Sequence, residues 1–331
     1  MATVETAARL HFGFQNLSLA HERLYGSLGV SLAAPRLQVE ADPAETVAAD
    51  HEAAREYARR ATDVLDVPGA TVSVTEALPR HVGLGSGTQL ALAVYAAVAR
   101  AYGTDPDVRT AAPALGRGGR SGVGTAGFER GGFLVDAGHP TGRFTTDRPA
   151  DGEWQVPAVV ARHELPVDWR FVVAVPDADP GRSGDEEEAS MRSVIERADP
   201  AIADRISGVV SRRLLPAAAG GRRSAFGDAV AEIGRLNGAW YADAQGGVFR
   251  PPVGTIVDEL SDCPAVTGAG QSSWGPTVYG LTDVDGADMA TEAAREALDT
   301  AGVDGDVLVA PVRNAGATVR GGAVESERGP Q

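Results

Sequence analysis

The chain of 331 residues is 43% hydrophobic and 23% charged, so it has enough apolar material for two compact units and is not a disordered tail. Thirty basic residues against 45 acidic ones leave a net charge of −15, and all thirty are arginine because the sequence contains no lysine. A surface this acidic repels phosphate backbones, which argues against a DNA- or RNA-binding protein. No reaction step can use a lysine as a phosphate clamp, Schiff-base former or general acid.

The acidic, lysine-free composition predicts a protein of a salt-saturated cytoplasm, where dissolved ions screen the large net charge. A genome biased toward arginine codons is the alternative, although it does not explain the excess of acid. No apolar run approaches the length of a membrane helix, and the first residues lack the layout of a secretion signal. Cys263 is the only cysteine, which excludes an internal disulfide and favours a small buried side chain.

In chain order, predicted strands and helices alternate without repeats, which is typical of two α+β layers packed side by side. Strands are expected at 4–14, 36–41, 71–76, 132–137, 171–175, 277–281 and 307–311, and helices at 51–65, 90–102, 107–115, 125–130, 200–215, 224–241 and 288–301. The stretch 142–157, rich in Gly, Pro and Asp, is the best linker candidate. We therefore expect an N-terminal lobe over 1–157, a C-terminal lobe over 158–316 and a frayed tail over 317–331.

Glycine accounts for 41 residues, more than is usual, and the excess falls in a few loops. The first loop, 79–89, follows a predicted strand and precedes a predicted helix. Its glycines let the backbone approach a ligand, and a helix start leaves amide hydrogens free, so the loop predicts an anion site. A tight turn in which Ser86 or Thr88 caps the helix is the alternative. No lysine follows and no acid lies at the dinucleotide spacing, so the loop is neither a P-loop nor a dinucleotide fingerprint.

Two further glycine loops contain polar side chains. The loop at 116–127 carries Arg117 and Arg120, and guanidinium forks match pairs of phosphate oxygens. Its alternative is a mobile surface loop whose arginines offset nearby acid. The loop at 266–279 has a glycine turn, a polar run and then a strand, for which a hairpin with a bulge is the alternative.

These residues together carry a resemblance. The run from Pro79 through Gly83, Gly85 and Gly87 resembles the phosphate loop of the GHMP kinase superfamily, and 268–271 lies where that superfamily has its C-terminal glycine motif. Within the superfamily the chain is most similar to the archaeal β-ribofuranosylaminobenzene 5′-phosphate synthases. The matching runs are 9–13, 83–89, 120–126, 128–133, 169–171 and 270–279, in order over nearly the whole chain. The run 270–279 is the most specific of them.

The resemblance implies a two-lobed α+β fold of the GHMP kinase type. The N-terminal lobe is expected to be similar to ribosomal protein S5 domain 2, the C-terminal lobe to be ferredoxin-like, and the site to lie between them. The reaction implied joins 5-phosphoribosyl 1-pyrophosphate to 4-hydroxybenzoate, or to 4-aminobenzoate, with loss of CO2 and pyrophosphate, in methanopterin-type cofactor biosynthesis. Such a reaction needs anion clamps and positioning, with Mg²⁺ as the expected cofactor.

Two other functions stay open. An ATP-dependent small-molecule kinase fits the first loop, but Gly124 stands where several GHMP kinases carry a catalytic aspartate, and the lysine that some of them pair with it is absent. A non-catalytic nucleotide- or metabolite-binding member of the superfamily is the third reading. The partners expected are the small-molecule substrates, with no nucleic acid and no membrane, and the sequence leaves a homodimer open.

Site residues follow from the motifs and the resemblance. Catalytic candidates are Arg120, as a second phosphate clamp, and His11, as a ligand of the substrate carboxylate or phosphate; their alternatives are a surface arginine and a structural strand histidine. The substrate-binding candidates are Arg9, Gly83, Leu84, Gly85, Ser86, Gly87, Thr88, Gln271, Ser272 and Ser273. For the last three, capping of their own loop is the alternative. Trp274 is expected to pack in the cleft rather than to stack on a ligand.

Metal ligands cannot be assigned from the sequence. The acidic run 185–188 stands at a predicted helix start, where a solvated cap that the helix dipole favours is more common than a magnesium site. The chain also lacks the hydrophobic strand ending in paired acids with which ordinary phosphoribosyltransferases bind ribose.

Overall fold

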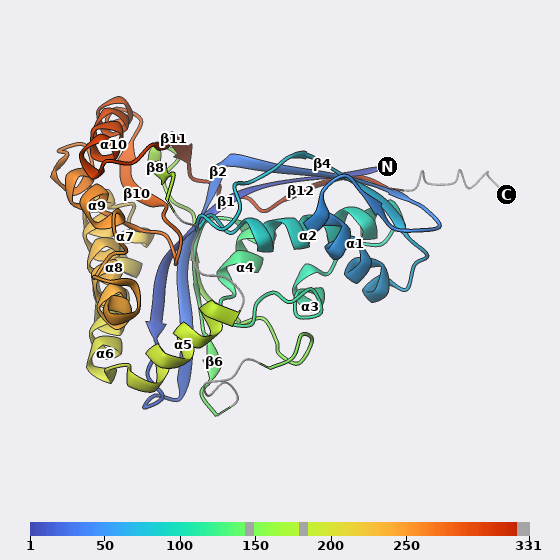
Figure 1. The fold of residues 1–331 in the computed structure, drawn as a ribbon, viewed down its shortest axis with the longest axis horizontal. Coiled ribbons are helices and arrows are strands. Elements are labelled where there is room, and N and C mark those ends of the chain that lie inside the picture. The colour runs from blue at the N-terminus through green and yellow to red at the C-terminus, as the bar shows by residue number, and fades with distance from the viewer. Residues whose placement is uncertain (143–148, 179–184, 323–331) are drawn as a thin grey trace.

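A computed structural model describes residues 1–142, 149–178 and 185–322. The chain forms two lobes, each with its own β-sheet (Figure 1). Most helices of the C-terminal lobe gather at the left of that view, and the helices of the N-terminal lobe lie with its sheet toward the right. Among the described residues, no helix combines the length and hydropathy needed to cross a bilayer.

The N-terminal lobe is built on a sheet with the order β12-β1-β2-β4-β3, to which β5, β6 and β7 are added through β2 and β5. Its strands are β1 (Ala2–Asn16), β2 (Arg23–Pro43), β3 (Ala48–Ala49), β4 (Ala70–Glu76), β5 (Phe133–Asp136), β6 (His139–Pro140), β7 (Val159–His163) and β12 (Thr318–Gly321). Its helices are α1 (Glu52–Leu65), α2 (Ser86–Ala101), α3 (Val108–Ala111) and α4 (Val123–Arg130).

The C-terminal lobe has a four-stranded antiparallel sheet with the order β11-β8-β10-β9. Its strands are β8 (Trp169–Pro176), β9 (Ala269–Gln271), β10 (Val278–Asp283) and β11 (Gly305–Pro311). Its helices are α5 (Asp185–Arg197), α6 (Pro200–Val209), α7 (Leu215–Ala219), α8 (Arg223–Gln245), α9 (Val253–Asp262) and α10 (Ala287–Ala301), with a π-helical stretch (Val210–Leu214) between α6 and α7. Two layered α+β lobes agree with the fold predicted from the sequence.

The boundaries differ from the predicted ones in two places. Strand β7 pairs with β5, so the N-terminal sheet continues past 157. The expected frayed tail is wrong for its first residues, because β12 pairs antiparallel with β1 and places Val319 opposite Val4. The local sequence of β12 does not indicate a strand, because its pairing partner is the first strand of the chain. Residues 323–331, and 143–148 of the expected linker, lie outside the described residues.

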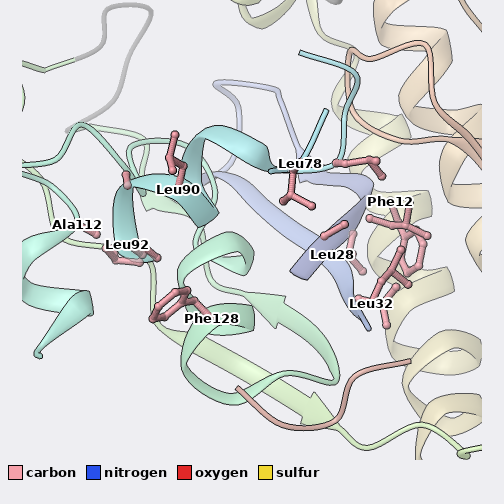
Figure 2. Packing of buried hydrophobic residues seen from close by; sticks show 14 of the residues in the cluster. Phe12, Leu28, Leu32, Leu78, Leu90, Leu92, Ala112 and Phe128 are labelled. Atoms are coloured by element: carbon pink, nitrogen blue, oxygen red, sulfur yellow. The ribbon is translucent and has the colours of Figure 1, made fainter. Parts of the chain in front are cut away.

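An aromatic cluster joins the lobes. Phe12 on β1 lies with its ring centroid 6.4 Å from Phe133 of the N-terminal sheet, 6.1 Å from Phe171 on β8 and 5.1 Å from Tyr279 on β10. Figure 2 shows Phe12 beside Leu28 and Leu32 of β2, within the same continuous core. Aromatic pairs at these spacings bury much area in fixed geometries. The cluster therefore holds β1 of the N-terminal sheet against the C-terminal sheet.

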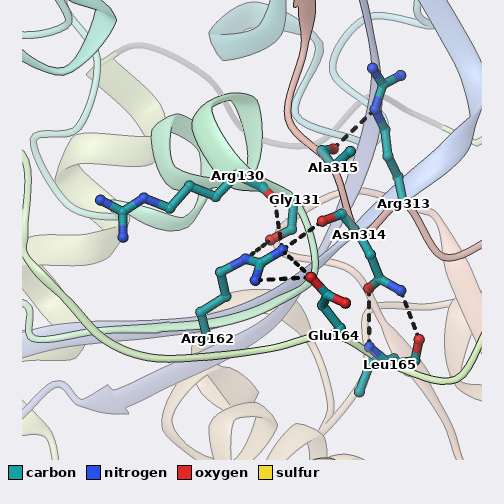
Figure 3. A network of polar contacts seen from close by, with 8 residues as sticks. All are labelled: Arg130, Gly131, Arg162, Glu164, Leu165, Arg313, Asn314 and Ala315. Atoms are coloured by element: carbon teal, nitrogen blue, oxygen red, sulfur yellow. Dashed lines mark hydrogen bonds and ion pairs between the residues drawn. The ribbon is translucent and has the colours of Figure 1, made fainter.

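The two crossings between the lobes are held together by hydrogen bonds (Figure 3). Arg162 on β7 donates through Nη2 to the carbonyl of Asn314 at 2.6 Å and through Nε to the carbonyl of Gly131 at 3.1 Å. The Asn314 side chain accepts from the Leu165 amide at 3.0 Å and donates to the Leu165 carbonyl at 2.8 Å. The outgoing and returning segments therefore leave the N-terminal lobe at one place.

Candidate active site

The predicted anion loop lies between β4 and α2. Gly85 is the N-cap of α2 in the left-handed conformation, with φ +79°, and no side chain caps this helix end. The amides of Thr88 and Gln89 donate to the Gly85 carbonyl at 3.1 Å as the helix begins. An uncapped helix start that follows glycines has amide hydrogens available to an anion.

Two glycines of this loop are required by close approach. A Cβ atom at Gly85 would lie 2.8 Å from Cγ of Arg9, and one at Gly83 would lie 2.3 Å from the carbonyl oxygen of Ser272. Both residues also have positive φ, so a side chain there is strained as well as obstructed. The loop therefore packs directly on β1 and on the third glycine loop.

Two nitrogen atoms of the Arg9 guanidinium have no hydrogen-bond acceptor among the described residues. The backbone amide of Arg9 donates to Leu84 at 3.1 Å, but its Nε and Nη1 atoms are shielded from solvent and have no hydrogen-bond partner. Burial of the guanidinium lowers the pKa of Arg9 to about 10, so it is charged at neutral pH. A buried, unpaired guanidinium is costly to the folded state, and an anion placed beside it would relieve that cost.

Arg9 opens into a cavity of about 210 Å³. The cavity is lined by Arg9, Thr88, Gly116, Arg117, Gly118, Gly119, Arg120, Ser121 and Gly124. A Cβ at Gly124 would lie 3.0 Å from Cγ2 of Thr88, so the first turns of α4 and α2 meet here. With three guanidiniums, two helix starts and a glycine backbone, this anion pocket is suited to a phosphate group.

The described residues that line the anion pocket include no acidic side chain. In the described part of the chain, no three His, Cys, Asp or Glu side chains gather as they would around a metal ion. The side chains of the acidic run 185–188, at the start of α5, lie outside that part, so its predicted role stays untested.

The third glycine loop is joined to the first through Ser272. The Ser272 hydroxyl donates to the Gly83 carbonyl at 2.8 Å and accepts from the His11 amide at 3.1 Å. The Thr277 amide also donates to Val82 at 3.2 Å. The first and third glycine loops therefore pack together beside β1, and the second loop meets the first where Gly124 approaches Thr88.

A second cavity lies on the other side of His11, between the lobes. It is lined by His11, Phe12, Gly13, Phe14, Gly234, Asn237, Gly238, Tyr241, Gln245, Val248, Phe249, Gln271, Ser273 and Trp274. The Tyr241 and Trp274 ring centroids are 4.4 Å apart. The free volume is about 40 Å³, whereas a cavity of about 150 Å³ accommodates benzene, so a ring that enters must displace side chains. We call this the aromatic pocket.

His11 lies in the aromatic pocket as a neutral imidazole. Burial, with the nearby Arg9 charge, lowers the pKa of His11 well below its usual range. Its Nδ1 atom is buried without a partner, and its ring meets Phe14 edge-on at 4.9 Å between centroids. Strand β1 is irregular between Ala7 and Arg9 and again between His11 and Gly13. Such bulges re-aim side chains, here on both sides of the Arg9–His11 segment.

The structure brings the predicted residues together but does not give them equal roles. Arg9, Thr88 and Arg120 line the anion pocket, and His11 and Ser273 line the aromatic pocket. Ser86 and Gly87 line a neighbouring cavity against Tyr57 of α1.

Three side chains predicted to bind substrate are engaged in hydrogen bonds within the protein or buried in its core. Gln271 accepts from the Arg250 amide at 3.1 Å and donates to the Ser273 carbonyl at 3.2 Å. The Gln271 bond to Ser273 is self-capping of the loop, whereas the Ser272 hydroxyl bonds to Gly83 and to the His11 amide, outside its own loop. Leu84 is buried, so the loop offers only its backbone there.

Several residues were missed as site residues. Arg117 lines the anion pocket with its guanidinium 5.2 Å from the Tyr57 ring centroid; its place beside Arg120 was the available signal. Asn237 and Tyr241 reach the aromatic pocket from α8, at a helical spacing that indicates only a buried helix face.

The fold and the first glycine loop are similar to those of GHMP kinases. A family model described as the GHMP kinases N terminal domain matches residues 48–132. The mevalonate kinase of Methanococcus jannaschii is 13% identical, with a TM-score of 0.64 over 94% of this chain and 98% of that one. A likeness at that identity establishes the fold alone.

Two relatives are much more similar in sequence. The β-ribofuranosylphenol 5′-phosphate synthase of Methanothermobacter thermautotrophicus is 31% identical over 85% of this chain and 88% of its own. That of Archaeoglobus fulgidus is 30% identical over 96% of this chain and 99% of its own. The chain belongs to the family of β-ribofuranosylphenol 5′-phosphate synthases, which confirms the resemblance inferred from its motifs.

Proposed function

We propose that the chain joins 5-phosphoribosyl 1-pyrophosphate to 4-hydroxybenzoate. The bond between the anomeric carbon and the pyrophosphate oxygen breaks, and a bond forms between that carbon and the ring carbon bearing the carboxylate. The carboxylate leaves as CO2 and its bonding electrons return to the ring. The product is a C-riboside 5′-phosphate of methanopterin-type cofactor biosynthesis. Both relatives are named for a ribofuranosylphenol, which supports 4-hydroxybenzoate over 4-aminobenzoate.

The observation that carries this proposal is the adjacency of two unlike pockets on one strand. Arg9 lines the anion pocket and His11, two residues on, lines the aromatic pocket. Two residues of a strand span about 7 Å, so a phosphorylated sugar in one pocket and a ring in the other would meet beside β1. A site of this kind provides positioning, which such a reaction chiefly needs.

Charge at the anion pocket would assist departure of the leaving group. Pyrophosphate gains negative charge as the anomeric bond breaks, and the guanidiniums of Arg9, Arg117 and Arg120 are fixed cations beside it. Within the described residues, the Nε and Nη1 atoms of Arg9 have no acceptor with which the leaving group must compete. The positive ends of α2 and α4 add to the same effect.

The aromatic pocket suits loss of CO2. A carboxylate is released more readily from an apolar surrounding than from water, where its charge is solvated. Phe14, Tyr241 and Trp274 supply that surrounding, and the neutral His11 provides a hydrogen bond without a compensating positive charge. We assign His11 to the ring substrate rather than to the phosphate.

We also propose that Mg²⁺ enters on the phosphate oxygens of the sugar substrate. The described lining of the anion pocket has no carboxylate to hold it. Mg²⁺ usually keeps several waters and binds substrate phosphates with few protein ligands, which agrees with this arrangement.

A carboxyl-labelled substrate tests the proposal. Purified protein in concentrated KCl, with 5-phosphoribosyl 1-pyrophosphate, Mg²⁺ and carboxyl-labelled 4-hydroxybenzoate, should release labelled CO2 and pyrophosphate in equal amounts. Loss of turnover at low salt would support adaptation to salt. Formation of ADP from ATP and a small alcohol, without CO2, would establish a kinase instead, and ligand binding without turnover would leave a binding protein.

A further inference from the structure

One buried carboxylate lies behind the anion pocket without lining it. Asp136 ends β5 and has no exposed surface. Its Oδ2 accepts the Gly122 amide at 2.7 Å and its Oδ1 accepts the Gly138 amide at 2.8 Å. Burial raises the pKa of Asp136 to about 6, so at pH 7 and above the group is an ionised carboxylate with both oxygens accepting.

The glycine loop that carries Arg117 and Arg120 becomes helix α4 at Gly122. Gly122 is the N-cap of α4 and follows Arg120 and Ser121 directly. A Cβ at Gly122 would lie 2.8 Å from the Pro157 carbonyl and 3.4 Å from Cβ of Asp136. Gly122 therefore packs closely against Pro157 and Asp136, and the Asp136 carboxylate fixes its amide.

The rest of the loop depends on such an anchor. Gly116 and Gly118 have positive φ, and Gly119 adds a third residue without a side chain. Glycine backbone loses much conformational entropy when it is fixed in one geometry. At the other end of the loop, the Trp154 indole donates to the Arg117 carbonyl at 2.8 Å. Asp136 and Trp154 thus fix the two ends between which the guanidiniums are carried.

We propose that Asp136 is a positioning residue that holds Arg120 and the first turn of α4 toward the phosphate groups of the substrate. This rests on the proposed function, since it takes the anion pocket as the phosphate site. A carboxylate is required because an asparagine in its place turns an NH2 group toward one of the two amides, and that amide loses its acceptor.

The test is the affinity for inorganic pyrophosphate, measured by calorimetry at pH 8 and fixed ionic strength. Asp136→Asn should raise the Kd about tenfold, the effect of one lost hydrogen bond to a charged group. Gly122→Ala disturbs the hydrogen bond between the Gly122 amide and Asp136 from the side of the amide, because its Cβ would meet the Pro157 carbonyl. It should also weaken pyrophosphate binding. Asp107→Asn is the matched control, because Asp107 accepts the Thr110 amide at 3.1 Å as the cap of α3, outside the anion pocket.

Kinetics separate positioning from loss of folded protein. A variant that merely unfolds lowers the apparent kcat and leaves KM unchanged, whereas a displaced clamp raises the KM for 5-phosphoribosyl 1-pyrophosphate in step with the pyrophosphate Kd. A wild-type Kd in folded Asp136→Asn or Gly122→Ala protein overturns the proposal. Failure of the wild type to release CO2, with the Kd differences intact, overturns the proposed reaction and not the role of Asp136.

Discussion

The anion pocket and the aromatic pocket meet at β1, the first through Arg9 and the second through His11, and are built from opposite materials. One has glycine backbone, helix starts and three guanidiniums around about 210 Å³ of space. The other is lined largely by rings from β1 and α8 and is almost filled, with about 40 Å³ free. The first is an open site for a charged ligand, and the second must be opened by the ligand that it binds.

The contrast suggests how one strand serves two substrates. Bulges flank the segment from Arg9 to His11, so adjacent side chains of one face serve different pockets. Both side chains carry unsatisfied nitrogen atoms that the folded chain leaves unpaired. A buried polar group without a partner calls for an explanation, and a ligand bound in each pocket would supply a partner to Arg9 or to His11. Each prediction below is aimed at one pocket, with the other as its comparison.

The largest effect is expected at Gly85. Replacement by valine adds strain at φ +79° and drives the side chain into Arg9, which lies 2.8 Å from the Cβ position. Pyrophosphate binding should weaken about a hundredfold or more, from roughly 3 kcal/mol of strain and displacement. Gly302→Val is the control, because φ is +69° there but no atom lies within 4 Å of the Cβ position. Equal affinity in wild-type and Gly85→Val protein would refute the assignment of the loop.

Arg9→Met should separate stability from function. Removal of the buried guanidinium should weaken pyrophosphate binding about thirtyfold, yet raise the free energy of unfolding by about 1 kcal/mol because an unpaired buried cation is lost. Calorimetry and denaturant unfolding measure the two changes. Arg295→Met, which removes an exposed ion pair with Glu292, should change neither much. A variant that loses stability would show that Arg9 is structural.

Trp274→Ala and Trp154→Phe should act on different substrates. Trp274 packs against Tyr241 in the aromatic pocket with the two rings tilted, so its loss should raise the KM for 4-hydroxybenzoate about tenfold and leave that for the sugar unchanged. Trp154→Phe removes the hydrogen bond to the Arg117 carbonyl. It should raise the KM for the sugar a few-fold and leave that for 4-hydroxybenzoate unchanged. Steady-state kinetics with each substrate varied decide the matter. If both variants raise both KM values, the two pockets are not separate.

The smallest effect concerns the pH dependence of stability. Burial raises the pKa of Asp136 to about 6, so the folded state binds its proton more strongly than the unfolded state. The contribution to stability is full below about pH 4 and is lost as pH rises through 6. Wild-type protein should lose about 1 kcal/mol relative to Asp136→Asn between pH 5 and pH 7. Asp107 gives the contrast, because hydrogen bonds from Thr110 lower the pKa of its carboxyl, and Asp107→Asn should show no such change in this range.

Local pattern was enough for part of this account. Gly85 and Arg120 could be proposed as site residues from the sequence, because glycine before a helix and arginine in a glycine loop favour anion binding in any fold. Helix α9 was overlooked although Val253, Ile256 and Val257 have the spacing of a buried helical face.

Other features depend on contacts that no local pattern records. The Ser272 hydroxyl accepts a hydrogen bond from the His11 amide, which lies 261 residues away in the chain. Asp136 reads as the end of an apolar strand until the Gly122 amide is seen beside it. The pairing of β12 with β1 likewise joins the two ends of the chain.

A crystal structure with pyrophosphate and 4-hydroxybenzoate bound together tests the central claim most directly. The account predicts pyrophosphate within hydrogen-bond distance of Arg9 and Arg120, and the ring between Phe14 and Trp274 with its carboxylate turned toward β1. Pyrophosphate bound on another face, or a ring outside the space between the lobes, would contradict it.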